Sequence, residues 1–142
     1  MIGQALPPVA LGPATGAATF LILTGGRFPR ALPQPLGRAT VVRWLALGTI
    51  GVLEEVAWRG VLLAALLLVV GPWTALSVTS IGFAAWHWPA LRGHCVVHLV
   101  TGAAFGAAFL AGGLVAAILG HVLYNILVDW AVHSNPARLR GP

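Results

Sequence analysis

The chain has 142 residues, of which 58% are hydrophobic and only 8% charged, and its mean hydropathy is +0.91. Soluble domains carry about 25% charged residues, and a chain this short has a large surface to cover with them. The net charge of +5 comes without a basic, aromatic-rich polar stripe, which argues against nucleic acid, and one cysteine excludes an internal disulfide. The composition therefore predicts an integral membrane protein.

Five apolar segments follow one another, and about 20 such residues cross a bilayer as a helix. We therefore predict an all-α fold, a polytopic transmembrane helical bundle of about five spans. The second segment is longer than one crossing needs, so we expect a break near Arg59–Gly60 and a further short, re-entrant helical piece. Gly112–Gly113 marks a turn between the last two spans. The five segments are Leu6–Thr24, Val41–Val70, Trp73–Trp88, Cys95–Leu110 and Leu114–Val132.

Most arginines lie in three segments outside the spans, which five crossings would place on the same side of the membrane. The positive-inside rule makes that side cytoplasmic, with the N-terminus outside and the C-terminus in the cytoplasm of a multi-pass cell-membrane protein. These arginines are Arg27, Arg30, Arg38, Arg43, Arg92, Arg138 and Arg140.

Glu54, Glu55 and Arg59 interrupt the second apolar segment. Each charge at the centre of a membrane helix costs about 2.5 to 3.5 kcal/mol, so the three cost about 8 to 10 kcal/mol. The Leu, Ile and Val residues around them return only about 3 to 5 kcal/mol. The deficit indicates that these groups face a polar interior, as a functional site or as a purely structural cluster.

Helix geometry separates the two carboxylates. Glu55 and Arg59 stand four residues apart in the orientation that favours an ion pair. Glu54 points about 100° away from Glu55, because a helix turns once every 3.6 residues. Glu54 is thus free to meet other helices and suits the work of a general base.

Two histidines are candidate partners for Glu54. His87 lies near the end of the third span, and His121 shares a helix face in the fifth span with Asn125. The alternative is a satisfied interfacial histidine for His87 and interhelical hydrogen bonding for His121 and Asn125. Because three separate spans each carry polar groups, we predict that they converge on one site.

Together these motifs resemble a known family. Glu54-Glu55-x-x-x-Arg59, Phe83-x-x-x-His87 and His121-x-x-x-Asn125 are similar, in this order, to the three signature motifs of the CAAX protease and bacteriocin-processing (CPBP) family of intramembrane peptidases. The family includes type II CAAX prenyl endopeptidase-like proteins. The resemblance spans roughly residues 41–133. It divides the chain into an N-terminal span with a cytoplasmic Pro/Arg loop (1–40), a peptidase core (41–133) and a short cytoplasmic tail (134–142).

The resemblance implies an endopeptidase that cleaves membrane-associated or lipidated peptides and proteins within the bilayer. It implies that Glu54 and His87 activate a water, and that His121 and Asn125 stabilise the oxyanion. Glu55 and Arg59 would support the site. Zinc held by Glu54, His87 and His121 remains an open option beside glutamate chemistry, since two His and a Glu can bind zinc with an open fourth position.

Other interpretations of the function and of the remaining residues stay open. A catalytically silent relative that acts as a membrane scaffold, immunity or maturation protein is the runner-up, and a proton-coupled carrier is a weaker reading. The chain has fewer N-terminal helices than usual for the family, so it could be a minimal member, a fragment, or a protein that completes its cavity by oligomerisation. The remaining polar residues are expected at the membrane interface, with Asp129 as a further candidate to extend the site; they are His94, His98, His133, Trp44, Trp73, Trp86, Trp88 and Trp130.

Overall fold

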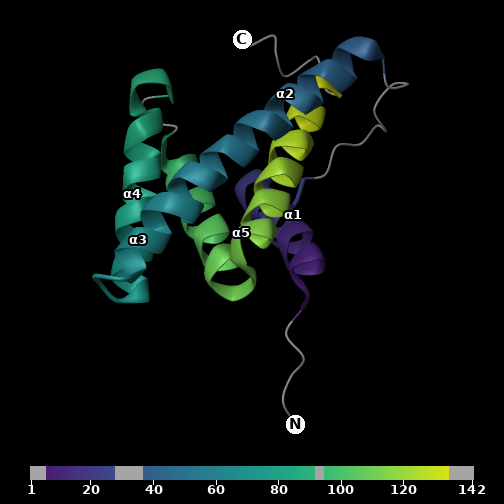
Figure 1. Cartoon of the computed structure of the whole chain (residues 1–142). Coiled ribbons are helices and arrows are strands. Elements are labelled where there is room, and N and C mark those ends of the chain that lie inside the picture. Colours follow the sequence, from purple (N-terminus) through teal and green to yellow (C-terminus); the bar gives the residue numbers. More distant parts are fainter. Residues whose placement is uncertain (1–5, 28–36, 92–94, 135–142) are drawn as a thin grey trace.

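The computed structural model describes residues 6–27, 37–91 and 95–134. All regular elements in these ranges are helices, and none of the described residues forms a strand (Figure 1). The expected all-α fold is therefore confirmed. The helices are α1 (Pro8–Thr24), α2 (Arg38–Glu55), η1 (Val56–Leu63), α3 (Ala64–Leu67), α4 (Pro72–Leu91) and α5 (Cys95–His133).

The second apolar segment forms one continuous helical rod, because α2, η1 and α3 follow each other directly. The expected break near Arg59–Gly60 is wrong, as is the separate re-entrant piece. The residues at the junctions keep right-handed helical backbone angles, and the irregularity is a π-helical stretch, η1. A single glycine costs a helix only about 1 kcal/mol, and a π-helical turn often marks a functional site.

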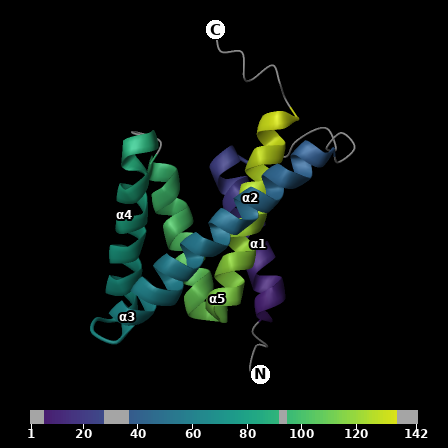
Figure 2. The same ribbon diagram turned by 45° about the horizontal axis from the view of Figure 1, so that its top comes forward.

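The last two apolar segments are joined into the single long helix α5, which doubles back at Gly113 (Figures 1 and 2). Gly113 has φ 73° and ψ −172°, a conformation that glycine adopts without the steric cost of a side chain. The predicted turn at Gly112–Gly113 is thus confirmed. The first arm of α5 runs from Cys95 to Gly112 and the second arm from Leu114 to His133.

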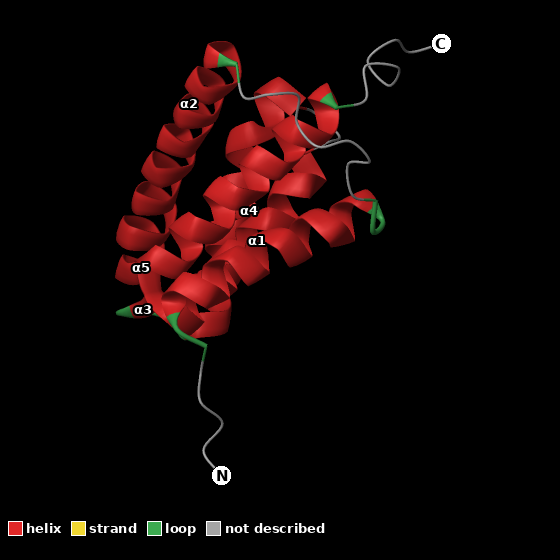
Figure 3. Cartoon of the chain, turned by 90° about the vertical axis from the view of Figure 1, so that its right-hand side faces the viewer, coloured by secondary structure: helices red, strands yellow, loops and turns green. Residues whose placement is uncertain are grey.

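Small residues hold the helices close together. A Cβ added to Gly12 of α1 would lie 2.5 Å from the carbonyl oxygen of Ala116, and one added to Gly16 would overlap the backbone of Gly120. α1 therefore packs directly against the second arm of α5. Similarly, a Cβ on Gly102 would lie 3.1 Å from the Cα of Ser80, which places the first arm against α4. Figure 3 shows the helices as one closely packed bundle.

The distribution of polarity is that of a membrane protein. Large apolar side chains face outward, among them Ile22, Leu45 and Trp73, which are 71%, 67% and 77% exposed. Charged Glu55 and Arg59 are instead fully buried. Within the described ranges, one helix, α5, is long and apolar enough to cross a membrane, and α1 is apolar but shorter. The count of five spans is therefore not confirmed.

Candidate functional site

The centre of the site is a buried ion pair on the α2–η1 rod. Arg59 donates from Nη1 to Oε1 of Glu55 at 2.8 Å, and the two side chains are 2% and 0% exposed. The guanidinium donates again, from Nη2 to the carbonyl oxygen of Gly102 at 3.0 Å, and its Cζ lies 4.8 Å from the centre of the Phe83 ring. Arg59 thus ties the rod to α4 and to the first arm of α5, and the pair predicted from the i,i+4 spacing is present.

Glu55 also reaches the second arm of α5. Its Oε1 lies 2.7 Å from Nδ1 of His121, which is 5% exposed. Because a carboxylate only accepts, Nδ1 of His121 carries the proton of this hydrogen bond. The other oxygen of Glu55, Oε2, is buried and has no hydrogen-bond partner within the described part of the chain. Glu55 therefore orients His121 so that its other nitrogen, Nε2, faces away from the ion pair.

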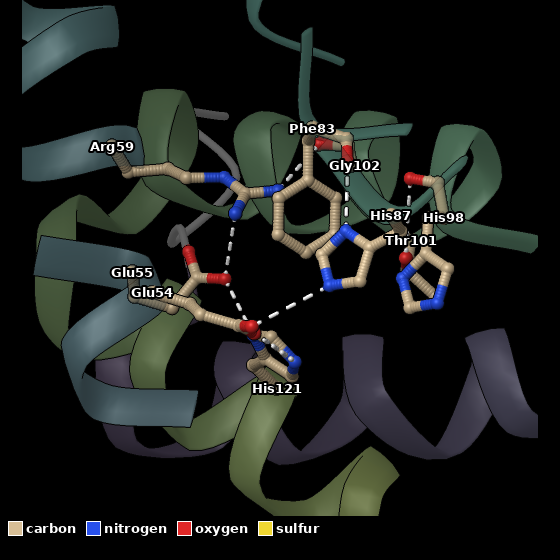
Figure 4. A network of polar contacts seen from close by, with 9 residues as sticks. All are labelled: Glu54, Glu55, Arg59, Phe83, His87, His98, Thr101, Gly102 and His121. Atoms are coloured by element: carbon tan, nitrogen blue, oxygen red, sulfur yellow. Dashed lines mark hydrogen bonds and ion pairs between the residues drawn. The ribbon is translucent and has the colours of Figure 1, made fainter. Parts of the chain in front are cut away.

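Glu54 lies between two imidazole rings that come from different helices (Figure 4). Its Oε1 is 3.5 Å from Nε2 of His87, and its Oε2 is 3.5 Å from Nε2 of His121. These distances exceed the usual length of a direct hydrogen bond, about 2.7 to 3.2 Å. The Glu54 side chain is 24% exposed, whereas that of Glu55 is 0% exposed. The adjacent acids thus occupy different environments, as their helical positions predicted.

His87 is held from two directions. Its Nδ1 lies 2.8 Å from the carbonyl oxygen of Phe83, so Nδ1 carries a proton and Nε2 is directed at Glu54. The Phe83 ring meets His87 edge to face at 4.6 Å, and Trp58 meets the other side of this aromatic cluster at 5.7 Å from Phe83. The spacing Phe83-x-x-x-His87 therefore serves to orient the imidazole.

Asn125 lies one helical turn beyond His121. Its Nδ2 is 3.4 Å from the position a Cβ would occupy on Gly51, and His121 Cγ is 3.7 Å from that same position. Gly51 sits one turn before Glu55 on α2. A Cβ at Gly51 would be in ordinary van der Waals contact with both polar side chains, so the second arm of α5 lies against α2 where His121 meets the two acids.

The first arm of α5 makes three contributions to the site that were not predicted from the sequence. His98 was expected at the membrane interface, yet its ring stacks on His87 at 3.9 Å with an interplanar angle of 6°. Phe105 stacks on His121 at 4.9 Å, and the Gly102 carbonyl accepts from Arg59. The sequence does contain a signal for these contacts, because positions 98, 102 and 105 share one helix face by their i, i+4 and i+7 spacing.

Asp129 belongs to a separate cluster. It accepts from Nε of Arg43 at 2.7 Å and from Nε1 of Trp44 at 2.9 Å, and Nδ1 of His133 lies 3.3 Å from its Oδ1. In the described ranges no contact joins Asp129 to Glu54. The side chain fastens the start of α2 to the end of α5 instead of extending the site.

An apolar groove lies along α2. It has a volume of about 550 Å³ and lies between the outer face of α2 and the second arm of α5. Leu53 and Val122 line it, and they are the sequence neighbours of Glu54 and His121. Along α2 it runs from Val41 to Leu53, about 18 Å at 1.5 Å per residue. Its remaining lining residues are Trp44, Leu45, Gly48, Thr49, Val52 and Ile126.

The zinc option has no geometric support in the described residues. They contain no group of three or more His, Cys, Asp or Glu side chains arranged to hold a metal ion. Each of the two histidines approaches a different oxygen of Glu54.

Comparison with known proteins adds one finding. A family model described as type II CAAX prenyl endopeptidase Rce1-like matches residues 37–127, which is most of the chain and contains all three polar motifs. No curated protein and no solved structure matches the chain significantly.

Proposed function

Because the chain belongs to the Rce1-like family of type II CAAX prenyl endopeptidases and is therefore a membrane protein, we propose that it is an intramembrane endopeptidase. Its substrates are membrane-associated or lipidated peptides and proteins, and its nucleophile is a water activated by Glu54 and His87. The observation that carries the proposal is the position of Glu54, with each carboxylate oxygen facing the Nε2 of a different histidine at 3.5 Å.

The first step needs a water bound to both Glu54 and His87. Glu54 Oε1 and unprotonated His87 Nε2 are both acceptors, and at 3.5 Å they are close enough for one water beside them to donate a hydrogen to each. Glu54 takes the proton as the water oxygen attacks the peptide carbonyl carbon. General-base catalysis of this kind contributes about 10²- to 10⁴-fold in rate.

The oxyanion formed in that step needs donors. His121 keeps its Nδ1 proton on Glu55, so its Nε2 donates only when the ring is an imidazolium. With Arg59, Glu55 and ionised Glu54, such an imidazolium gives two positive and two negative charges, a balanced cluster. Nδ2 of Asn125 is the second donor. Each donor aimed at an oxyanion is worth about 10²- to 10³-fold.

Glu54 completes the cycle. As the tetrahedral intermediate collapses, the bond between carbonyl carbon and peptide nitrogen breaks, and Glu54 returns its proton to that nitrogen. The products are a carboxylic acid and an amine, and the site is restored. Glu55 and Arg59 take no proton in this scheme; they hold His121 and fix the rod against the first arm of α5.

The apolar groove along α2 supports an apolar substrate. Its only polar lining side chains are Trp44 and Thr49, and these already donate to Asp129 and to the carbonyl oxygen of Leu45. An occupant therefore needs no hydrogen bonds. A hydrocarbon chain attached to the substrate and lying in this groove would reach Leu53, the residue that precedes Glu54 on α2.

The membrane arrangement is part of the proposal. α1, the α2–η1–α3 rod, α4 and the two arms of α5 each cross the bilayer of the cell membrane, with the N-terminus outside and the C-terminus in the cytoplasm. The two arms of α5 are about 27 and 30 Å long at 1.5 Å per residue, close to the thickness of about 30 Å of the hydrocarbon core. Oligomerisation would add helices that enclose the site.

The proposal is tested by reconstitution in liposomes with a library of lipidated and unmodified peptides. We expect cleavage by the wild type and a loss of at least about 100-fold for Glu54→Ala and His121→Ala. His133→Ala, in the separate Asp129 cluster, is the matched control and should cleave normally. Equal turnover by all four proteins would refute the catalytic assignment. Absence of cleavage by the wild type would favour a silent scaffold.

A further inference from the structure

His98 is an imidazole of the site that neither the motifs nor the proposed chemistry use. It lies on the first arm of α5, and its imidazole covers a face of the His87 ring at 3.9 Å with the planes only 6° apart. Figure 4 shows His87 between Glu54 on one side and His98 on the other. The Phe83 ring meets both imidazoles, at 4.6 Å and 5.6 Å.

The orientation of His87 depends on these neighbours. The hydrogen bond from Nδ1 to the Phe83 carbonyl fixes one point of the ring but permits it to swing about that point. Phe83 contacts it at 60°, which limits motion toward that side. His98 lies flat against one face of the ring and limits motion toward that face. Without it, Nε2 of His87 is free to leave the position 3.5 Å from Glu54.

His98 is itself held in place. It shares its helix face with Gly102, whose carbonyl accepts from Arg59, and with Phe105, which stacks on His121. The first arm of α5 thus contacts three parts of the site through one face.

We infer that His98 is a positioning residue, which holds the His87 imidazole in the plane that directs its Nε2 at Glu54 by stacking on it. The inference rests on the proposed function. Its action is through the flat ring and not through the ring nitrogens. A small displacement of a catalytic group can cost up to about 100-fold in rate, and we expect about tenfold for loss of one of several restraints.

The test compares His98→Ala, His98→Leu and His98→Phe with the wild type in liposomes, using a peptide that the wild type cleaves. We expect kcat to fall about tenfold in the Ala and Leu variants with KM unchanged. We expect the Phe variant to keep at least about half of the wild-type kcat, because phenylalanine offers a flat face for stacking. Gel filtration and thermal unfolding of each variant show that it is folded, and Leu fills the space if Ala does not fold.

The outcomes are separable. Wild-type kcat in the Ala and Leu variants would overturn the inference while leaving the proposed function standing. A Phe variant as slow as the Ala variant would also overturn it, since the ring nitrogens would then be needed. A raised KM with unchanged kcat would indicate substrate contact and would overturn it too. A wild type that cleaves no peptide refutes the proposed function, and the inference falls with it.

Discussion

The buried pair of Glu55 and Arg59 makes the sharpest stability prediction. Both residues are fully buried, and Glu55 Oε1 accepts from Arg59 and from His121 at 2.8 and 2.7 Å. Glu55→Gln removes the negative charge and leaves the buried guanidinium without its ion-pair partner. Breaking a buried pair in this way costs about 3 to 5 kcal/mol, so the ratio of folded to unfolded protein should fall by at least about 100-fold.

The double variant separates this cause from simple loss of packing. Arg59→Met alone leaves the buried Glu55 carboxylate without its ion-pair partner. It should lower the free energy of unfolding about as much as Glu55→Gln does. Glu55→Gln combined with Arg59→Met removes both charges and keeps similar volumes, so its cost should be smaller than that of either single variant. Glu54→Gln, at the adjacent and partly exposed position, is the matched control and should change stability little.

The protein carries its own reporter for the measurement. Its single cysteine, Cys95, is 8% exposed and becomes accessible to a thiol-reactive fluorophore on unfolding. A titration with denaturing detergent, followed by this label, gives the stability of the wild type and of all four variants. A double variant less stable than both single variants, or Glu55→Gln as stable as Glu54→Gln, would refute the reasoning about buried charge.

Three further predictions concern other parts of the molecule. Gly16→Ala should destabilise the protein by about 1 to 3 kcal/mol, because the added methyl meets the Gly120 backbone, while Gly71→Ala, with nothing within 4 Å, should be neutral in the same titration. Asp129→Asn should cost about 1 kcal/mol, because its partner Arg43 is 36% exposed, and should leave peptide cleavage within about twofold of wild type. Treatment with a chelator should leave cleavage unchanged; a loss that added zinc reverses would show that a metal takes part.

Helix geometry and hydropathy predicted a large share of the molecule. Apolar length and the Gly112–Gly113 pair predicted the helices and the reversal in α5, because they depend on local backbone properties. The i,i+4 spacing of Glu55 and Arg59 predicted their ion pair for the same reason. The divergence of Glu54 from Glu55 also followed from 3.6 residues per turn.

Features that depend on contacts between helices were harder to predict from the sequence. The break expected near Arg59–Gly60 did not occur, and residues 56–63 stay helical. Arg59 donates to the Gly102 carbonyl oxygen on α5, and the sequence of the second segment alone does not reveal this partner. His98 was expected at the membrane interface because it lies near the end of its span. Its stacking on His87 of α4 cannot be predicted from its own helix. Asp129 likewise takes its role from Arg43, which is remote in sequence.

The central claim, that Glu54 activates the water for peptide hydrolysis, is tested most directly by the rate of Glu54→Gln. This change keeps the shape of the side chain and removes the carboxylate that faces His87 and His121. With a lipidated peptide in liposomes, kcat should fall by at least about 100-fold while the denaturation midpoint stays at the wild-type value. A Glu54→Gln protein that cleaves within about threefold of the wild-type rate would contradict the account.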